Sequence, residues 1–167
     1  LNKHDLEFVI HLGDFIDRDY SSFDKVLPIY QSLQMPAYHA LGNHDFDVAD
    51  ELKGKVVERM GMKSKYYEFS VKDWRFIVLD GNDVSFHAYP KNSPKYKDAE
   101  RYYRENKIRS PRWNGAVGSE QVAWLRKILQ KAEKQKEQVA VFCHFPVYPT
   151  DPHNLWNAGE IISLFEE

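Results

Sequence analysis

The chain has 167 residues, enough for one domain with a sizeable core. Its apolar fraction of 43%, charged fraction of 29% and net charge of −2 are ordinary for a globular protein, and they argue against a general nucleic-acid-binding surface. No apolar stretch approaches the roughly 18 residues needed to span a bilayer, and the single cysteine allows no disulfide within the chain, so we expect a cytoplasmic protein without nucleic-acid or membrane partners.

The first forty residues predict a β-α-β unit. Residues 7–12 form a short run rich in β-branched and apolar side chains that stops at Gly13, as a buried parallel strand does. Apolar residues then recur at helical spacing over 23–33, and Pro28 within this pattern predicts a kink or a later start. Residues 37–41 form the next strand, so we expect a parallel pair with a crossover helix.

The middle of the chain changes from parallel to antiparallel pairing. Residues 48–60 predict a helix, with Gly61 as its stop. Two strands over 66–71 and 75–80 follow, joined by a two-residue turn, which indicates an antiparallel hairpin. The second of these strands is apolar enough to lie centrally in a sheet.

The remaining elements complete a single α/β domain. Residues 81–118 predict a long irregular segment, with a short charged helix over 98–107. Ser119 is predicted to cap a strong amphipathic helix, and residues 138–143 form the next strand. A last helix is predicted over 157–165. The whole order favours one layered α/β domain over 1–167.

Three strand ends carry residues that bind metals. Asp14, Asn43 and His144 each follow a buried-type strand, and ligands gather beyond the carboxyl ends of strands in open α/β sheets. A carboxylate, an amide oxygen and an imidazole make a mixed ligand set that suits Mn, Fe or Zn better than calcium. Asp14 is the natural bridge between two cations, and two such metals can clamp a phosphoryl group and generate hydroxide at neutral pH. The sequence therefore predicts a dinuclear site that hydrolyses a phosphate ester or anhydride.

The turn after the second strand adds a candidate catalytic group. His44 follows Asn43 directly, so its imidazole could act as a general acid or stabilise negative charge. Asp45 or Asp17 could hold the other ring nitrogen and favour the imidazolium form. Arg18 could contact a phosphate oxygen of the substrate.

Other candidates have structural alternatives. His11 lies within the first strand and is expected to be packed rather than ligating. Cys143 is expected to be a buried strand residue with no chemical role. Several aromatic residues could stack on a nucleobase, although anchoring of loops to the core is an equal expectation: Tyr89, Tyr96, Tyr102, Tyr103, Trp113 and Trp156.

The motifs around these residues resemble those of the calcineurin-like metallophosphoesterases. The resemblance rests on Gly13-Asp14-Phe15-Ile16-Asp17-Arg18, Gly42-Asn43-His44-Asp45 and His144-Phe145-Pro146. Within that superfamily, Trp113-Asn114-Gly115-Ala116-Val117-Gly118, Glu120-Gln121-Val122-Ala123-Trp124-Leu125 and Leu155-Trp156-Asn157 are similar to the manganese-dependent ADP-ribose/CDP-alcohol diphosphatases.

The resemblance implies a fold, a metal site and a substrate class. It implies a four-layer αββα fold, here partial, in which Asp14 bridges two divalent metals, manganese first and iron or zinc next. It further implies that Asn43 and His144 bind the second metal and that His44 is the catalytic histidine. The implied substrate is a small phosphorylated molecule, a nucleotide of the ADP-ribose or CDP-alcohol type.

Two motifs of that family have no counterpart in the chain. An opening Asp-x-His would precede Asp14, and a closing Gly-His-x-His would follow His144. We therefore expect a single metallophosphoesterase domain over 1–167 that lacks its N- and C-terminal motif segments, and an isolated fragment with impaired activity. The alternatives are a phosphomonoesterase or a cyclic-nucleotide phosphodiesterase of the same fold, and a non-catalytic interaction domain.

Overall fold

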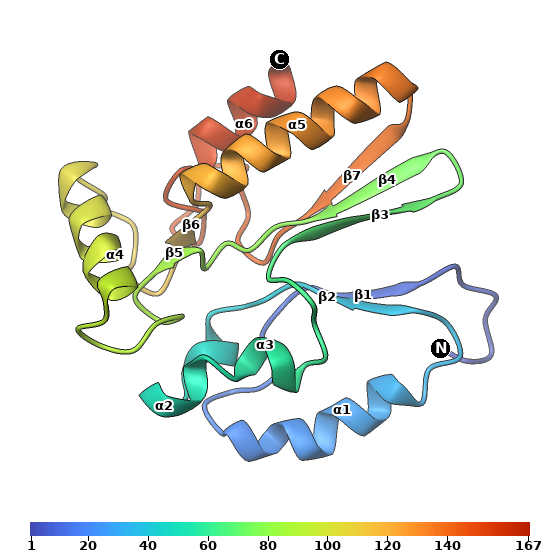
Figure 1. Cartoon of the computed structure of the whole chain (residues 1–167), viewed down its shortest axis with the longest axis horizontal. Coiled ribbons are helices and arrows are strands. Elements are labelled where there is room, and N and C mark those ends of the chain that lie inside the picture. Colours follow the sequence, from blue (N-terminus) through green and yellow to red (C-terminus); the bar gives the residue numbers. More distant parts are fainter.

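Three small sheets form the framework of the protein in the computed structural model, which describes residues 1–167 (Figure 1). The first sheet is a parallel pair, the second has three strands in the order β3-β4-β7, and the third is a short antiparallel pair. The strands are β1 (Val9–His11), β2 (Ala37–His39), β3 (Tyr67–Val71), β4 (Trp74–Val78), β5 (Val84–Ser85), β6 (Gly115–Ala116) and β7 (Gln138–Phe142).

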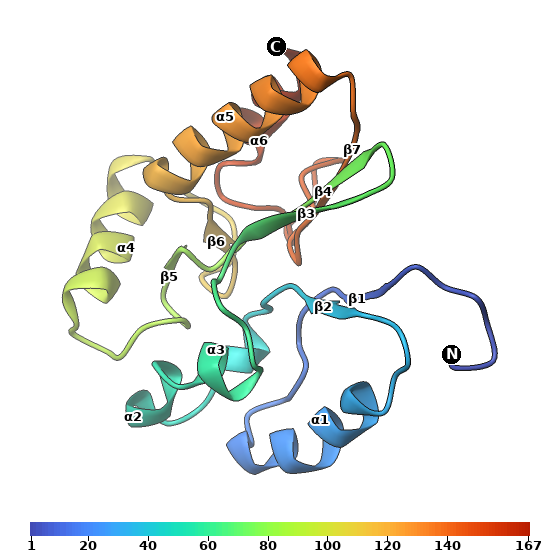
Figure 2. The same ribbon diagram turned by 45° about the vertical axis from the view of Figure 1, so that its right-hand side comes forward.

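Helices cover the outer faces of the two main sheets, while α4 (Pro94–Glu105) lies beside β5 of the short antiparallel pair (Figure 1). The other helices are α1 (Phe23–Gln31), α2 (Asp50–Lys53), α3 (Val56–Arg59), α5 (Ser119–Gln135) and α6 (Ala158–Glu166), with short 3-10 turns at Tyr20–Ser22 and His44–Phe46. In both views α5 and α6 lie beyond the β3-β4-β7 sheet, and α1 lies beyond the β1-β2 pair on the opposite side (Figures 1 and 2). The predicted layered α/β fold is therefore confirmed. No helix combines the length and the apolar character needed to cross a membrane.

Aromatic side chains fill the space between the two main sheets. Phe8 packs edge-on against Phe69 and Phe76, with ring centroids 5.1 and 4.7 Å away. Tyr38 of β2 stacks on Phe69 of β3 at 3.6 Å. Aromatic pairs of this kind add stabilisation beyond their buried area. The alternation of side chains along β3 and β4 places these rings on the inner face, so the strand pattern itself generates the contact between layers.

The β1-α1-β2 unit matches its prediction. The two strands run parallel with His11 opposite His39, and α1 crosses between them. Pro28 lies inside α1 without ending it. The helix buries Phe23 and Leu27 in a hydrophobic cluster with Phe15 and Leu41, which follow the two strands, and this packing outweighs the hydrogen bond that proline cannot donate.

The hairpin and the last strand also match. β3 and β4 pair antiparallel with Val71 opposite Trp74, and β4 is the central strand, paired in parallel with β7. Residues at the start of β7 and α6 fall within a residue of the predicted boundaries. The core under α5 and α6 contains Ile77, Leu125 and Ile161, which are fully buried.

Three local predictions are wrong. The helix expected over 48–60 is two short helices, α2 and α3, because Gly54 ends the first one. The segment over 81–118 is less irregular than expected: it contains β5 and β6, and the short helix expected over 98–107 is the 12-residue α4, which begins earlier, at Pro94, where the side chain of Ser93 accepts from Tyr96 N. Ser119 does not cap α5, since Gly118 occupies the N-cap position and no side chain caps that end.

Candidate metal centre

Three side chains from three strand ends converge on one point. His144 Nε2 lies 3.3 Å from Asn43 Oδ1 and 3.5 Å from Asp14 Oδ2. His144 Nδ1 lies 2.8 Å from the carbonyl oxygen of Leu12, which can only accept, so Nδ1 carries a proton. In the neutral ring Nε2 is then a lone-pair donor that faces two oxygen acceptors. Three electron-pair donors pointing at one another form a set that a cation between them would stabilise.

Close packing of glycines makes this approach possible. Gly13 has φ +101°, and a Cβ there would lie 2.6 Å from His144 Nδ1. Asp14 itself adopts the left-handed region at φ 57°, which is uncommon outside glycine. The amide of His44 donates to Asp14 Oδ1 at 3.0 Å, so the two ligand-bearing turns are joined directly. The strained backbone at Asp14 therefore turns its carboxylate toward the second turn.

The amide oxygen of Asn43 is needed to complete this set. No group of three or more His, Cys, Asp and Glu side chains is arranged to hold a metal ion. The Asn43 amide oxygen is therefore essential to this set, since Asp14 and His144 supply only one carboxylate and one imidazole. The donors fit one divalent cation on this side of the site, with Asp14 free to share a second oxygen.

The catalytic candidate His44 is held by Asp17. Its Nδ1 lies 2.7 Å from Asp17 Oδ1, and this hydrogen bond raises the pKa of His44 above its ordinary value. The same bond lowers the pKa of Asp17. Of the two carboxylates that the sequence offered as a partner for the ring, the structure selects Asp17. His44 is therefore oriented, and its imidazolium form is favoured.

The expectation that Asp45 orients His44 is wrong. Asp45 is fully buried, and its carboxylate accepts hydrogen bonds from the amides of Phe15 (2.6 Å), Ile16 (3.2 Å) and Gly42 (2.9 Å). Burial raises the pKa of Asp45 to about 6, while these amide donors oppose the shift. Its role in the structure is to tie the loop after β1 to the loop after β2.

Arg18 lies beside the centre but is already paired. Its Nε is 3.4 Å from Asp17 Oδ1 and 3.3 Å from Asp47 Oδ2. It lines the same cleft as the three metal-binding candidates. Two carboxylates compensate its charge, which weakens the case for Arg18 as a phosphate contact.

The cleft around the centre has a volume of about 770 Å³ and includes residues that the sequence analysis did not select. Its walls are Asp14, Arg18, Asn43, His44, Asp47, His87, Arg112, Trp113, His144, Phe145, Pro146 and His153. His87 and Arg112 were missed because each lies in a loop far from the ligand motifs in sequence, and His153 was missed because it lies in no ligand motif although it follows His144 in the same loop. The one available signal was the position of Arg112 beside the tryptophan of the Trp-Asn-Gly motif.

Only one of the aromatic candidates for base stacking lines this cleft. Trp113 does, whereas Trp156 is buried against Phe86, Tyr102 and Tyr103. Tyr89, Tyr96, Tyr102 and Tyr103 likewise pack against hydrophobic clusters. Most of these rings therefore anchor the 81–118 segment to the hydrophobic clusters.

The structure confirms that His11 is packed, whereas Cys143 is half-buried and lies just after β7 rather than within the strand. His11 packs edge-on against Phe15 and Tyr30, with ring centroids 5.1 and 5.6 Å away, and burial lowers its pKa. Burial raises the pKa of the Cys143 thiol to about 12, so it holds almost no thiolate at neutral pH. Neither residue is a metal-ligand candidate.

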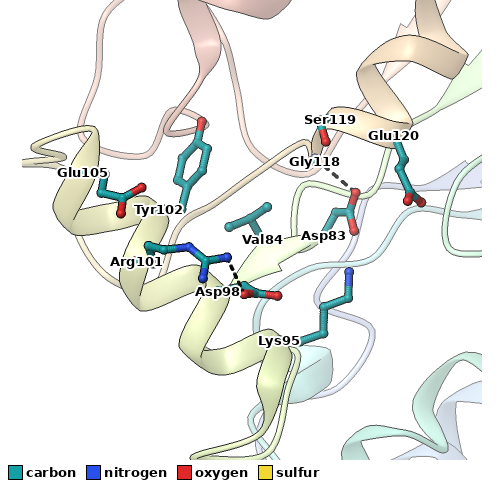
Figure 3. A pocket seen from close by; sticks show the side chains of 10 residues that line it. All are labelled: Asp83, Val84, Lys95, Asp98, Arg101, Tyr102, Glu105, Gly118, Ser119 and Glu120. Atoms are coloured by element: carbon teal, nitrogen blue, oxygen red, sulfur yellow. Dashed lines mark hydrogen bonds and ion pairs between the residues drawn. The ribbon is translucent and has the colours of Figure 1, made fainter.

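A second cavity lies between α4 and the start of α5 and shares no lining residue with the cleft (Figure 3). Asp83 accepts from the amide of Gly118 at 3.1 Å, and Arg101 donates to Asp98 at 2.7 Å. None of the predicted metal-binding or catalytic residues lines this cavity.

Comparison with known proteins places this geometry in a family. The sequence matches the calcineurin-like phosphoesterase family over residues 1–166. It is 29% identical to a manganese-dependent ADP-ribose/CDP-alcohol diphosphatase from Oryza sativa subsp. japonica over 99% of the chain and 60% of that protein. It is 28% identical to the human protein of the same name over 93% of the chain and 57% of that protein. The chain therefore spans about 60% of the length of the curated relatives it matches.

A solved structure confirms the fold. A crystal structure of a dimetal phosphatase from Danio rerio superposes with a TM-score of 0.80 at 23% identity, covering 96% of the chain and 62% of that protein. With its sequence matched from end to end and its fold shared, the chain belongs to the calcineurin-like phosphoesterase family.

Proposed function

We propose that the whole protein is a metal-dependent hydrolase of phosphoric ester or anhydride bonds, and that residues 1–167 form a single metallophosphoesterase domain within it. The observation that carries this proposal is the convergence of Asp14, Asn43 and His144 beside an oriented His44. Family membership supports it.

The ligand residues would hold two divalent cations. Asp14 would bridge them, and Asn43 and His144 would bind one of the pair through Oδ1 and Nε2. The relatives' names specify manganese dependence, which makes manganese the first choice, with iron or zinc as alternatives that suit the same donors. When bound, such ions activate water and neutralise charge on phosphoryl oxygens. The Leu12 carbonyl keeps the His144 ring in the tautomer that leaves Nε2 free to bind.

His44 would supply the proton for the leaving oxygen. Asp17 holds Nδ1 and raises the pKa of the ring, so Nε2 carries a proton over a wider pH range than in a free histidine. A positioned imidazolium can donate this proton as the phosphorus–oxygen bond breaks, and its charge stabilises the transition state before the transfer.

The substrate would be a nucleoside-diphosphate-linked compound of the ADP-ribose or CDP-alcohol type. The names of the relatives and the volume of the cleft support this choice. A cytoplasmic location is part of the same proposal and is supported by the single cysteine in the sequence.

The test uses the full-length protein purified with Mn²⁺. Asp14→Ala and Asn43→Ala should each abolish metal-dependent hydrolysis of ADP-ribose and of a CDP-alcohol. Asp19→Ala is the matched control, because this exposed carboxylate caps Ser21 and does not line the cleft. Full turnover by either ligand variant would overturn the proposal. A panel that adds a phosphomonoester and a cyclic nucleotide separates the three substrate classes by their kcat/KM values.

A further inference from the structure

The cleft contains one arginine whose charge no carboxylate compensates. Arg18 pairs with Asp17 and Asp47, whereas Arg112 makes no ion pair with any acidic side chain. The Arg112 guanidinium instead lies over the ring of Phe86, 4.3 Å from its centroid, and 5.7 Å from that of Tyr103. Cation–π packing fixes the direction of the side chain and leaves its hydrogen-bond donors free. Arg112 is thus a preorganised cation at the wall of the cleft.

An aromatic face lies next to this cation. Trp113 is half-buried, and its ring lies 4.9 Å from that of His153 across the cleft wall. His153 is held by Asp151, whose carboxylate lies 2.6 Å from its Nδ1. Both rings line the cleft that holds Asp14, Asn43 and His144. An indole ring beside a guanidinium group is complementary to a ligand in which a planar ring is joined to an anion.

The loops that carry these rings are fixed by one buried amide. Asn114 is fully buried, and its Nδ2 donates to the carbonyls of Pro152 (2.6 Å) and Asn154 (2.8 Å). The indole of Trp156 adds a bond from Nε1 to the carbonyl of Pro111 at 3.1 Å. The Trp113 loop and the His153 loop are therefore held together before any ligand binds, which lowers the cost of binding.

From these contacts we propose that Arg112 and Trp113 form the subsite for the part of the substrate that does not react. Arg112 binds the phosphate next to the reacting one, and Trp113 stacks on the base. The ligand class is a nucleoside diphosphate, because a sugar phosphate without a base would leave the indole face unused. The assignment of this subsite to substrate rests on the proposed function, while its affinity for nucleotides does not.

Binding, measured without turnover, tests the subsite directly. The protein is titrated with CMP, ADP and ribose 5-phosphate by calorimetry, with Mn²⁺ and again with EDTA. Trp113→Ala should weaken CMP binding roughly tenfold and leave ribose 5-phosphate binding unchanged, whereas Trp113→Phe should retain most of the affinity. Trp74→Phe, in the β3-β4 hairpin and outside the cleft, should have no effect.

The role of Arg112 is tested by comparing the affinities of the protein for ADP and AMP, which differ by one phosphate. In the unmodified protein ADP should bind more tightly than AMP, and Arg112→Gln should remove roughly tenfold of that advantage. Arg112→Lys should restore part of it, since it keeps the charge and loses the planar fork. Arg104→Gln, an exposed arginine on α4, is the charge-matched control.

The outcomes separate the subsite from the catalytic proposal. Asp14→Ala should lose hydrolysis and keep CMP binding in EDTA. Unchanged CMP affinity in Trp113→Ala, or no measurable binding of CMP and ADP by the unmodified protein, overturns the subsite while the catalytic centre stands. Hydrolysis that survives Asp14→Ala, together with weakened CMP binding in Trp113→Ala, overturns the proposed function and supports the subsite.

Discussion

The backbone of Gly42 packs so closely against Asp14 that no side chain fits at position 42. A Cβ atom at Gly42 would overlap Oδ1 and the backbone nitrogen of Asp14 and would lie 2.9 Å from its Cγ. The backbone of one ligand turn is thus packed directly against the carboxylate of the other. This contact sets how closely Asp14 and Asn43 approach.

A methyl group at Gly42 should therefore disrupt the centre. Gly42→Ala should lower the free energy of unfolding by about 3 kcal/mol or more, because the atoms it would meet are backbone and a fixed carboxylate. The folded fraction should also lose Mn²⁺ binding in calorimetric titration. Gly54→Ala is the control: nothing lies within 4 Å of its Cβ position, its φ is −66°, and a gain of about 0.4–1 kcal/mol is expected. Equal stability of the two variants would show that the ligand turns can move apart.

Removing the Asp17 carboxylate should lower the pKa of His44. Asp17→Asn loses the hydrogen-bonded anion that is the largest cause of the raised pKa. Titration of the His44 ring by NMR should show a shift toward acid. Asp19→Asn, which removes a carboxylate bonded only to Ser21, should leave the His44 titration in place. An unchanged midpoint in Asp17→Asn would assign the ring to another partner.

The hydroxyl of Tyr67 replaces a missing strand neighbour of β2. It accepts from the amide of His39 at 3.0 Å and donates to the carbonyl of the same residue at 2.9 Å. Tyr67→Phe leaves both backbone groups without a partner and should cost about 1–3 kcal/mol in urea denaturation. Tyr66→Phe removes a neighbouring hydroxyl that makes no hydrogen bond within the protein, and it should change stability by less than about 0.5 kcal/mol. A cost for Tyr66→Phe as large as that for Tyr67→Phe would contradict this account.

His39 should contribute a loss of stability in mild acid. Burial lowers its pKa to about 4, whereas the unfolded chain titrates near the ordinary value of about 6.5. Between these values the unfolded state takes up a proton that the folded state does not, so the His39 contribution to stability is lost as the pH falls through this window. The buried carboxyls of Asp45 and Asp80, whose pKa burial raises to about 6, act in the opposite direction, so the measurement is a difference: urea midpoints of the unmodified protein should fall relative to those of His39→Gln as the pH is lowered. His11, whose pKa burial also lowers, keeps part of the pH dependence in that variant. His4→Gln, an exposed position, should leave the pH dependence unchanged.

The convergence of Asp14, Asn43 and His144 was predictable because its signals are local. A short apolar strand that ends in Gly13 or Gly42 places the next side chain at a strand end, and parallel strands bring their carboxyl ends to one edge. The hairpin was predictable for the same reason, since the alternation in β3 and β4 and the turn between them fix its register.

Which carboxylate holds the His44 ring, that of Asp17 or that of Asp45, could not be predicted from the local sequence. It depends on the left-handed backbone at Asp14 and Arg18, which turns Asp17 outward toward His44. Asp45 lies next to His44 in sequence, yet it points inward to three amides. Sequence distance favoured the wrong carboxylate, because the direction of a side chain within a turn follows from φ and ψ.

Trp113 was a stacking candidate from sequence, but the place of Arg112 beside it in the cleft was not predictable because it depends on distant contacts. Asn114 reaches carbonyls about 40 residues further along the chain. The same is true of the break between α2 and α3, where packing of Val56 and Met60 outweighs continuation of the helix through Gly54. Such contacts leave no periodic pattern.

The carboxylate of Asp45 also bears on how an ion would enter and leave the proposed metal centre. By accepting from the amides of Phe15 and Gly42 at once, it fixes the turn after β1 and the turn after β2 relative to each other. Their disorder is removed when the chain folds, so capture of an ion would need no loop closure and would be limited by ligand exchange in the ion's own hydration shell. After an ion left, the two turns would keep the same arrangement.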